Sequence, residues 1–256
     1  MFLPGAAMLK VLLTIDTEAH AISKDWQRDH LARDIQRDIY GRIGERSVGL
    51  DYQLEALERF GLKAVFMVES LFSAVPEIGP EPLREIVGKI HKGGHEVQLH
   101  LHPEWVPFCP ELKVEYRSEL LRDYSLEEQT RMIAFASEKL QACGAEKPIA
   151  FRAGGFAADG NTIAALERAH IRFDTSFNIW YAGGKCRLAE PESYGRATPI
   201  GSGDVLEIPI GAMEDYPGHL RHAQICACGG MKWYMRWSRR RRTGGNSSPS
   251  SPILLR

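Results

Sequence analysis

Three histidines and two glutamates fall within residues 94–105, GHEVQLHLHPEW, more polar groups than a buried strand ordinarily carries. Residues two apart on a strand point to the same face, so His100 and His102 share a face. Two imidazoles and a carboxylate are a common ligand set for a divalent ion, and three protein ligands with a position left for water are typical of catalytic zinc. His95 precedes the expected strand and is interpreted as a structural histidine.

A second polar group, in LTIDTE, follows the first apolar run of the chain. Asp16 and Glu18 obey the same spacing rule and would present two carboxylates to one cleft. Two close carboxylates repel each other, so one requires a cation and the other a proton or a basic partner. The alternative is that they are solvated acids at the end of a strand.

Arg152 lies in FRAGGF, where the glycines allow the backbone to approach a cleft closely. An arginine beside two carboxylates would keep one of them ionised and would fix its orientation. The alternative is a surface arginine before a turn.

Strand-like and helix-like segments alternate along the chain, which predicts an α/β fold with a parallel sheet or barrel. Residues 17–49 are polar and are expected to form a long loop or a partly helical insertion. The expected strands are residues 9–15, 62–70, 97–101, 147–155, 171–176 and 205–210. The expected helices are residues 50–60, 82–91, 125–143 and 161–170. In such folds the functional site lies at the C-terminal ends of the strands. The polar clusters fall there: Asp16 with Glu18, His100 with His102, Arg152, and Asp174 with Ser176.

The composition is that of a globular protein. The 256 residues are 44% hydrophobic and 25% charged, enough for one large domain or two small ones. The five cysteines are odd in number and scattered, which argues against a disulfide framework and predicts a reducing, cytoplasmic location. No apolar run approaches the roughly 20 residues of a membrane-spanning helix. Nothing indicates the oligomeric state.

The last part of the chain differs in composition. Residues 216–256 contain eight Lys and Arg and no acid, which leaves 24 basic against 33 acidic residues in the rest. We therefore predict a domain at residues 1–215 and a basic, Gly/Ser/Pro-containing, poorly ordered tail without strands at residues 216–256. The tail is interpreted as solvated chain, as a binding segment for nucleic acid or another anionic surface, or as the product of a truncation or frameshift.

Five stretches together resemble a known family. LTIDTE, KAVFMVES, GHEVQLHLHPEW, FRAGGFAADGNTIAALE and FDTS occur in the order found in the NodB-type polysaccharide deacetylases, carbohydrate esterase family 4, and most resemble the branch with HLHP in its second motif. The resemblance covers residues 9–210. It implies a deformed (β/α) barrel with a metal at the strand ends, here expected to be incomplete at its C-terminal end.

The resemblance also implies roles for individual residues. Asp16 matches the general base of the first motif. Most members place the metal-binding acid directly after it, where this chain has Thr17, so the metal role passes to Glu18. Trp105 and Asp174 are expected to bind substrate.

In the second motif His100 matches the first metal-binding histidine. Four residues on, where the family has another histidine, this chain has Glu104, so the remaining ligand is either His102 or Glu104. Arg152 matches the arginine that pairs with the base.

The implied reaction is metal-dependent removal of N-acetyl groups from an amino-sugar polymer or glycan, or hydrolysis of a small amide with a non-peptide C–N bond. Zinc is the expected metal, and the same ligands suit cobalt, nickel and manganese. We do not expect nucleic acid as a partner. The family's last motif carries a general-acid histidine that is not found here, and His219 and His222 are the remaining candidates. One alternative is therefore a catalytically impaired or inert remnant of the fold, and a second is binding to nucleic acid or an anionic surface through the tail.

Overall fold

One large sheet organises the molecule. The computed structural model describes residues 10–20, 31–192, 194, 196–225 and 252–255. Eight strands form the sheet in the order β12-β1-β4-β5-β6-β7-β9-β8, and every neighbouring pair is parallel except β8 and β9. The strands are β1 (Lys10–Thr17), β4 (Val65–Glu69), β5 (Glu96–Leu101), β6 (Ala150–Ala153), β7 (Phe173–Asp174), β8 (Thr198–Ile200), β9 (Val205–Glu207) and β12 (Pro252–Leu255).

The register of the central strands aligns their C-terminal ends. Glu69 on β4 pairs with His100 on β5, and His100 pairs in turn with Arg152 on β6. Parallel strands buried on both faces read as nearly continuous apolar runs, which is why the sequence pattern predicted them. The polar side chains at their ends are therefore brought to one edge of the sheet.

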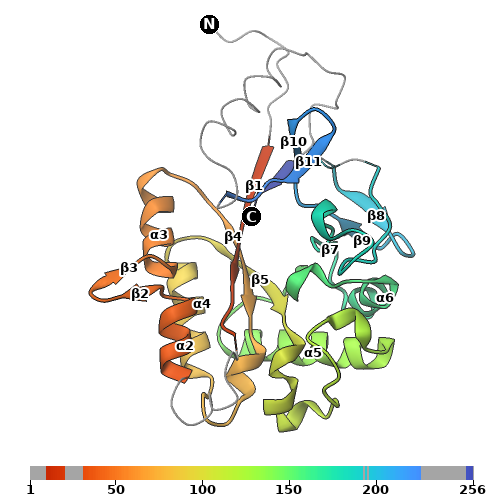
Figure 1. The fold of residues 1–256 in the computed structure, drawn as a ribbon. Helices are drawn as coiled ribbons and strands as arrows, with labels where there is room; N and C mark the ends of the chain where they lie inside the picture. Colours follow the sequence, from red (N-terminus) through yellow and green to blue (C-terminus); the bar gives the residue numbers. More distant parts are fainter. Residues whose placement is uncertain (1–9, 21–30, 193, 195, 226–251, 256) are drawn as a thin grey trace, which may run out of the picture.

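In the described residues, five α-helices connect and cover the strands. They are α2 (Leu31–Asp38), α3 (Leu50–Arg59), α4 (Glu81–Lys92), α5 (Leu126–Ala142) and α6 (Gly160–Ala169). In Figure 1, α2, α3 and α4 gather on one side of the strands, and α5 and α6 lie on the other. Helix α5 begins at the predicted capping box, in which the Ser125 side chain accepts a hydrogen bond from the Glu128 N–H and the Glu128 carboxylate accepts one from the Ser125 N–H.

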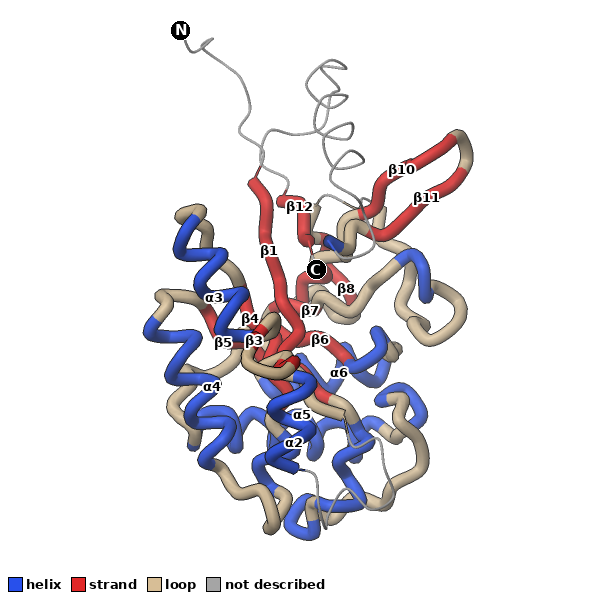
Figure 2. The backbone as a smooth tube through the Cα atoms, turned by 60° about the vertical axis from the view of Figure 1, so that its left-hand side comes forward, coloured by secondary structure: helices blue, strands red, loops and turns tan. Residues whose placement is uncertain are grey.

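Short elements fill the connections. Two hairpins are formed by β2 (Arg42–Ile43) with β3 (Arg46–Ser47), and by β10 (Ala212–Tyr216) with β11 (His219–His222). Figure 2 shows that the second hairpin projects beyond the large sheet. Six 3-10 helices are η1 (Leu71–Ala74), η2 (Pro103–Phe108), η3 (Pro110–Leu112), η4 (Leu121–Asp123), η5 (Gly154–Phe156) and η6 (Ile179–Tyr181).

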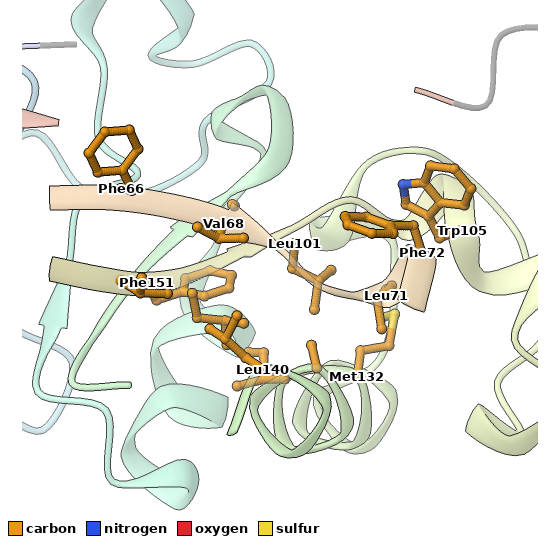
Figure 3. Close-up of a cluster of buried hydrophobic side chains, with 14 of the residues drawn as sticks. Phe66, Val68, Leu71, Phe72, Leu101, Trp105, Met132, Leu140 and Phe151 are labelled. Atoms are coloured by element: carbon orange, nitrogen blue, oxygen red, sulfur yellow. The ribbon is translucent and has the colours of Figure 1, made fainter. Parts of the chain in front are cut away.

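One part of the core fills the space between the sheet and α5, and another includes buried residues of α3 and α4. Figure 3 shows Val68 of β4 and Leu101 of β5 facing Met132 and Leu140 of α5. All four side chains have no exposed surface. Burying an aliphatic side chain of this size stabilises the fold by about 1.5–3 kcal/mol. This packing holds the ends of β4 and β5 in place, and those ends carry the polar residues discussed below.

The predicted α/β architecture is confirmed, with a mostly parallel sheet. Among the described residues, β12 and β8 form the two edges of the sheet and do not pair with each other, so these strands do not close a barrel. The predicted strands and helices are found within a few residues of their expected bounds. The insertion at residues 17–49 contains α2 and the β2–β3 hairpin, whereas β8, β10 and β11 were not predicted.

The predicted domain boundary after residue 215 falls inside β10. Residues 226–251, with most of the basic segment, lie outside the described residues, so the division into domain and tail and the binding role of the tail stay predictions. Contrary to expectation, the last residues do include a strand, since β12 pairs with β1. The cysteines within the described residues, Cys109, Cys143 and Cys186, are free and buried. In the described part of the chain, no helix has the length and hydrophobicity needed to cross a membrane.

Candidate active site and metal centre

Asp16 and Arg152 form a buried ion pair between β1 and β6. The Arg152 Nη1 donates to the Asp16 Oδ1, while Nη2 donates to the hydroxyls of Thr14, at 2.8 Å, and Thr175, at 3.0 Å. Its Nε donates to the Thr175 carbonyl at 3.2 Å. The Arg152 side chain has no exposed surface and that of Asp16 is 4% exposed. Every nitrogen of the guanidinium thus has a fixed partner, so Asp16 is held in one orientation beside a permanent positive charge.

Glu18, His100 and His102 form a compact second cluster directly beside this pair. The Glu18 Oε2 lies 2.7 Å from the Nε2 of His100 and 2.7 Å from the Nε2 of His102, and the two Nε2 atoms are 3.2 Å apart. His100 is buried, whereas the side chains of His102 and Glu18 are 12% and 19% exposed. Because His100 also contacts the backbone of Arg152, the ion pair and the cluster form one continuous site.

The hydrogen-bond pattern of the cluster fits a cation. The His100 Nδ1 lies 2.8 Å from the Arg152 carbonyl, which accepts only, so Nδ1 carries a hydrogen. In the neutral ring Nε2 then presents a lone pair to the Glu18 carboxylate and to His102. A backbone carbonyl behind a histidine in this way is the usual second contact of a metal ligand. Converging carboxylate and imidazole groups are the ligands that zinc and similar ions prefer, so the residues fit the expected divalent ion.

The carboxylate of the cluster is ionised. Burial by itself raises the pKa of Glu18, but close contact with His100 and His102 and their Coulombic attraction together outweigh it, so the pKa lies well below its ordinary value. An ionised carboxylate is what a metal ligand requires.

Two neighbours fix the position of His102. A Cβ added to Gly154 would lie 2.6 Å from the Cγ and Nδ1 of the His102 ring, so only glycine leaves room for this ring. The Glu69 carboxylate at the end of β4 accepts hydrogen bonds from the backbone N–H groups of His102 and Leu71. Burial, partly offset by the nearby His102 and these two N–H groups, raises the pKa of Glu69 to about 8.

The structure separates the two candidates for the remaining ligand. His102 lies in the cluster, whereas Glu104 belongs to η2, and its Oε1 is buried with no hydrogen-bond partner among the described residues. The geometry favours His102 as the ligand.

Trp105, which was expected to bind substrate, is buried. The side chain is 1% exposed and packs edge-to-face against Phe72 in the core (Figure 3). Its Nε1 donates to the Ala19 carbonyl at 3.2 Å. Trp105 has no surface here with which to bind a substrate, and it instead anchors the segment that follows Glu18.

Asp174 is also fully buried. It accepts a hydrogen bond of 2.6 Å from the Ser176 hydroxyl, which itself accepts from the Ala153 N–H at 2.9 Å. Glu207 occupies the paired position on β9 and is buried as well. Burial raises the pKa of both carboxyls, so the pair retains a proton. In this structure Asp174 supports the end of β6 and is closed to substrate.

Sequence reasoning missed His20. The alternation that selected Asp16 and Glu18 extends one step further, to His20, and this was the available signal. Ligand atoms of Glu18, His20 and His102 lie within 4.8 Å of one another. His95, in contrast, is a structural histidine as predicted, since it is buried and its Nδ1 accepts the Ala64 N–H at 3.3 Å.

A series of aromatic rings leads from Arg152 to the surface. The Phe156 ring centroid lies 5.9 Å from the Arg152 guanidinium carbon. The same ring stacks on that of Tyr181, with centroids 5.3 Å apart. Phe156 has a φ of +60°, which is rare for a bulky residue, so its position is strained. The ring centroids of Tyr181 and His222 are 6.5 Å apart, and those of His222 and the half-exposed Trp180 are 5.7 Å apart.

The histidines considered as proton donors lie in this outer region. The His222 Nδ1 is 3.3 Å from the Asn178 amide nitrogen. His219 stacks on Tyr216 with a centroid distance of 4.3 Å.

Comparison with known proteins identifies the fold. The sequence matches no family model, and no curated protein matches it. The structure is similar to that of a candidate polysaccharide deacetylase from Mycobacterium smegmatis, with a TM-score of 0.59 and 17% identity over 100% of this chain and 78% of the other. A family 4 carbohydrate esterase from Streptomyces lividans gives a TM-score of 0.40 and 15% identity over 68% and 65% of the two chains. A family 4 pseudoenzyme from Bacillus anthracis gives a TM-score of 0.44 and 11% identity over 98% of this chain and 55% of the other. The chain thus has the fold seen in the mycobacterial protein.

Proposed function

We propose that this chain is a metal-dependent hydrolase that removes N-acetyl groups from an amino-sugar glycan. The observation that carries the proposal is the junction of the Asp16–Arg152 pair with the Glu18–His100–His102 cluster at the C-terminal ends of β1, β5 and β6. The mycobacterial protein that shares this fold is itself named as a candidate polysaccharide deacetylase.

Asp16 is suited to act as the base. A general base must be ionised and fixed within reach of the proton that it removes. The Arg152 guanidinium supplies the compensating charge, and Thr14 and Thr175 prevent that guanidinium from turning away. Asp16 would take a proton from the attacking water and would hold it on a carboxylate oxygen.

Glu18, His100 and His102 would hold a divalent ion beside this base. Bound there, the ion supplies a Lewis acid that polarises the acetyl carbonyl and makes water more acidic. The protein contributes a fixed ligand geometry, because Gly154 and Glu69 position His102 and the Arg152 carbonyl orients His100.

The outer aromatic rings are suited to a sugar. Trp180 is 53% exposed, and a tryptophan ring of this kind offers an apolar face together with a polar N–H. His222, Tyr181 and Phe156 connect it to Arg152. We infer that these rings receive the glycan, since the substrate contacts expected from Trp105 and Asp174 are closed by burial.

Acetate release tests the proposal directly. The purified chain is loaded with zinc and incubated with N-acetylated oligosaccharides, while bound metal is measured in parallel. Asp16→Asn is expected to reduce the rate by at least about 100-fold, since general bases contribute about 10²–10⁴-fold, and to leave the metal content unchanged.

Two results would refute parts of the proposal. Acetate release by Asp16→Asn at the wild-type rate would exclude Asp16 as the base. Stoichiometric metal without acetate release by the wild-type chain would support the alternative of a catalytically inert remnant.

A further inference from the structure

His20 lies at the outer side of the metal cluster, and the proposed function gives it no role. Its Nε2 is 3.9 Å from the Glu18 Oε1, and its ring meets that of His102 edge-to-face with centroids 5.4 Å apart. The side chain is 39% exposed, so it lies nearer the surface than those of His100 and His102.

The two oxygens of Glu18 face different histidines. Oε2 contacts His100 and His102, both at 2.7 Å, whereas Oε1 is directed toward His20. Ligand atoms of Glu18, His20 and His102 lie within 4.8 Å of one another. Around a tetrahedral zinc ion with bonds of about 2.1 Å, ligand atoms are about 3.4 Å apart, and the 3.9 Å between the His20 Nε2 and the Glu18 Oε1 is close to this spacing.

The segment that carries His20 is held from two sides. The Trp105 Nε1 donates to the Ala19 carbonyl, and the His20 N–H donates to the Asp38 Oδ2 at 3.0 Å. The same Asp38 oxygen lies 3.9 Å from the His20 Nδ1. A carboxylate behind a histidine is a common second contact of metal ligands, because it orients the ring and increases its basicity.

Asp38 is fixed in turn by Arg37, whose Nε and Nη2 donate to the two carboxylate oxygens at 2.5 and 2.7 Å. Both residues end α2, within the insertion between β1 and α3. The insertion therefore brings the Asp38 carboxylate to the Nδ1 side of His20, while the Nε2 of the same ring is on the side of Glu18.

We propose that His20 is a fourth protein ligand of the ion held by Glu18, His100 and His102, with Asp38 as its positioning residue. The inference rests on the metal site of the proposed function and extends it. A tetrahedral zinc ion with four protein ligands leaves no position for water, so hydrolysis would require a fifth coordination position or the departure of His20 from the ion. The outer position of His20 makes it the ligand that limits access to the ion.

The test measures metal binding apart from catalysis. Metal-free wild type, His20→Ala, Asp38→Asn and the control His91→Ala are titrated with Zn²⁺ by calorimetry, and visible absorption spectra are recorded with Co²⁺. His91 is an exposed histidine on α4 and serves as the matched control.

His20→Ala is expected to weaken Zn²⁺ binding by about tenfold or more and to change the Co²⁺ spectrum, because one nitrogen ligand is lost. Asp38→Asn is expected to weaken binding less, and His91→Ala should leave affinity and spectrum unchanged. Thermal melting of the metal-free proteins confirms that each variant is folded.

Zn²⁺ affinity of His20→Ala within twofold of wild type, together with an unchanged Co²⁺ spectrum, would overturn the inference and leave the proposed function standing. A wild-type chain that binds neither ion would overturn both the inference and the metal dependence of the proposed function.

Discussion

The substitution Gly154→Ala would displace the His102 ring without replacing any of the proposed metal ligands. Gly154 is not one of the glycines with a positive φ, so alanine tolerates its backbone conformation. The added Cβ would lie 2.6 Å from two atoms of the His102 ring, and ordinary contact requires 3.4 Å. The substitution therefore changes no ligand, but the ring or the backbone must move by about 0.8 Å.

The displacement is large on the scale of the site. The Glu18 Oε2 and the His102 Nε2 are 2.7 Å apart. A shift of the His102 ring by about 0.8 Å away from Glu18 would separate these atoms beyond hydrogen-bonding distance. We expect Zn²⁺ affinity to fall about 10–100-fold and acetate release to fall about 100-fold, as for other misplaced catalytic groups. Overpacking would lower the free energy of unfolding by about 1–3 kcal/mol, so the protein should remain folded.

Calorimetric titration with Zn²⁺ and an acetate-release assay give the two readouts. Gly160→Ala is the matched control, because a Cβ at Gly160 meets nothing within 4 Å, and it should bind Zn²⁺ as the wild type does. A folded Gly154→Ala protein with wild-type Zn²⁺ affinity and wild-type rate would refute the view that contact with Gly154 sets the position of His102.

Three further substitutions test the surroundings of the site. Arg152→Met leaves the buried Asp16 carboxylate without its cation and should lower the free energy of unfolding by about 3–5 kcal/mol in urea titrations; a loss below about 1 kcal/mol would contradict the buried ion pair. The raised pKa values of Asp174 and Glu207 mean that the folded pair keeps a proton that the unfolded chain releases. The bound proton therefore stabilises the folded state fully below about pH 4. This stabilisation is lost as the pH rises through the raised pKa values, and the free energy of unfolding falls by up to about 1.4 kcal/mol per pH unit. Glu207→Gln should flatten this decline in unfolding experiments between pH 5 and 8, and an unchanged slope would count against the shared proton. Ser125→Ala removes the capping box of α5 and should cost about 1 kcal/mol in urea while Zn²⁺ affinity stays constant; a change in affinity would mean that α5 acts on the site.

Much of this site follows from local sequence. The alternation of strand residues identified the shared faces of Asp16 with Glu18 and of His100 with His102, because a period of two is a property of the strand alone. Apolar runs and the capping box gave the order of strands and helices. The rule that parallel strands bring their C-terminal ends to one edge then linked Arg152 to residues more than a hundred positions away.

Other assignments depended on packing that no local pattern records. Trp105 and Asp174 stand at strand ends, as site residues do, and only the tertiary structure shows that both are buried in supporting roles. The preference for His102 over Glu104 likewise rests on distant residues, since Gly154 leaves space for the imidazole and Glu69 binds its backbone N–H.

The sequence alone determined the α/β class, most of the strands of the large sheet and the residues at their ends, because periodicity and capping act within a few neighbouring residues. It did not determine that His20 joins the cluster or that Asp38 lies behind it. That contact arises where the insertion folds back past Glu18, over a separation of 18 residues, and the path of such a connection is set by its packing against the rest of the chain.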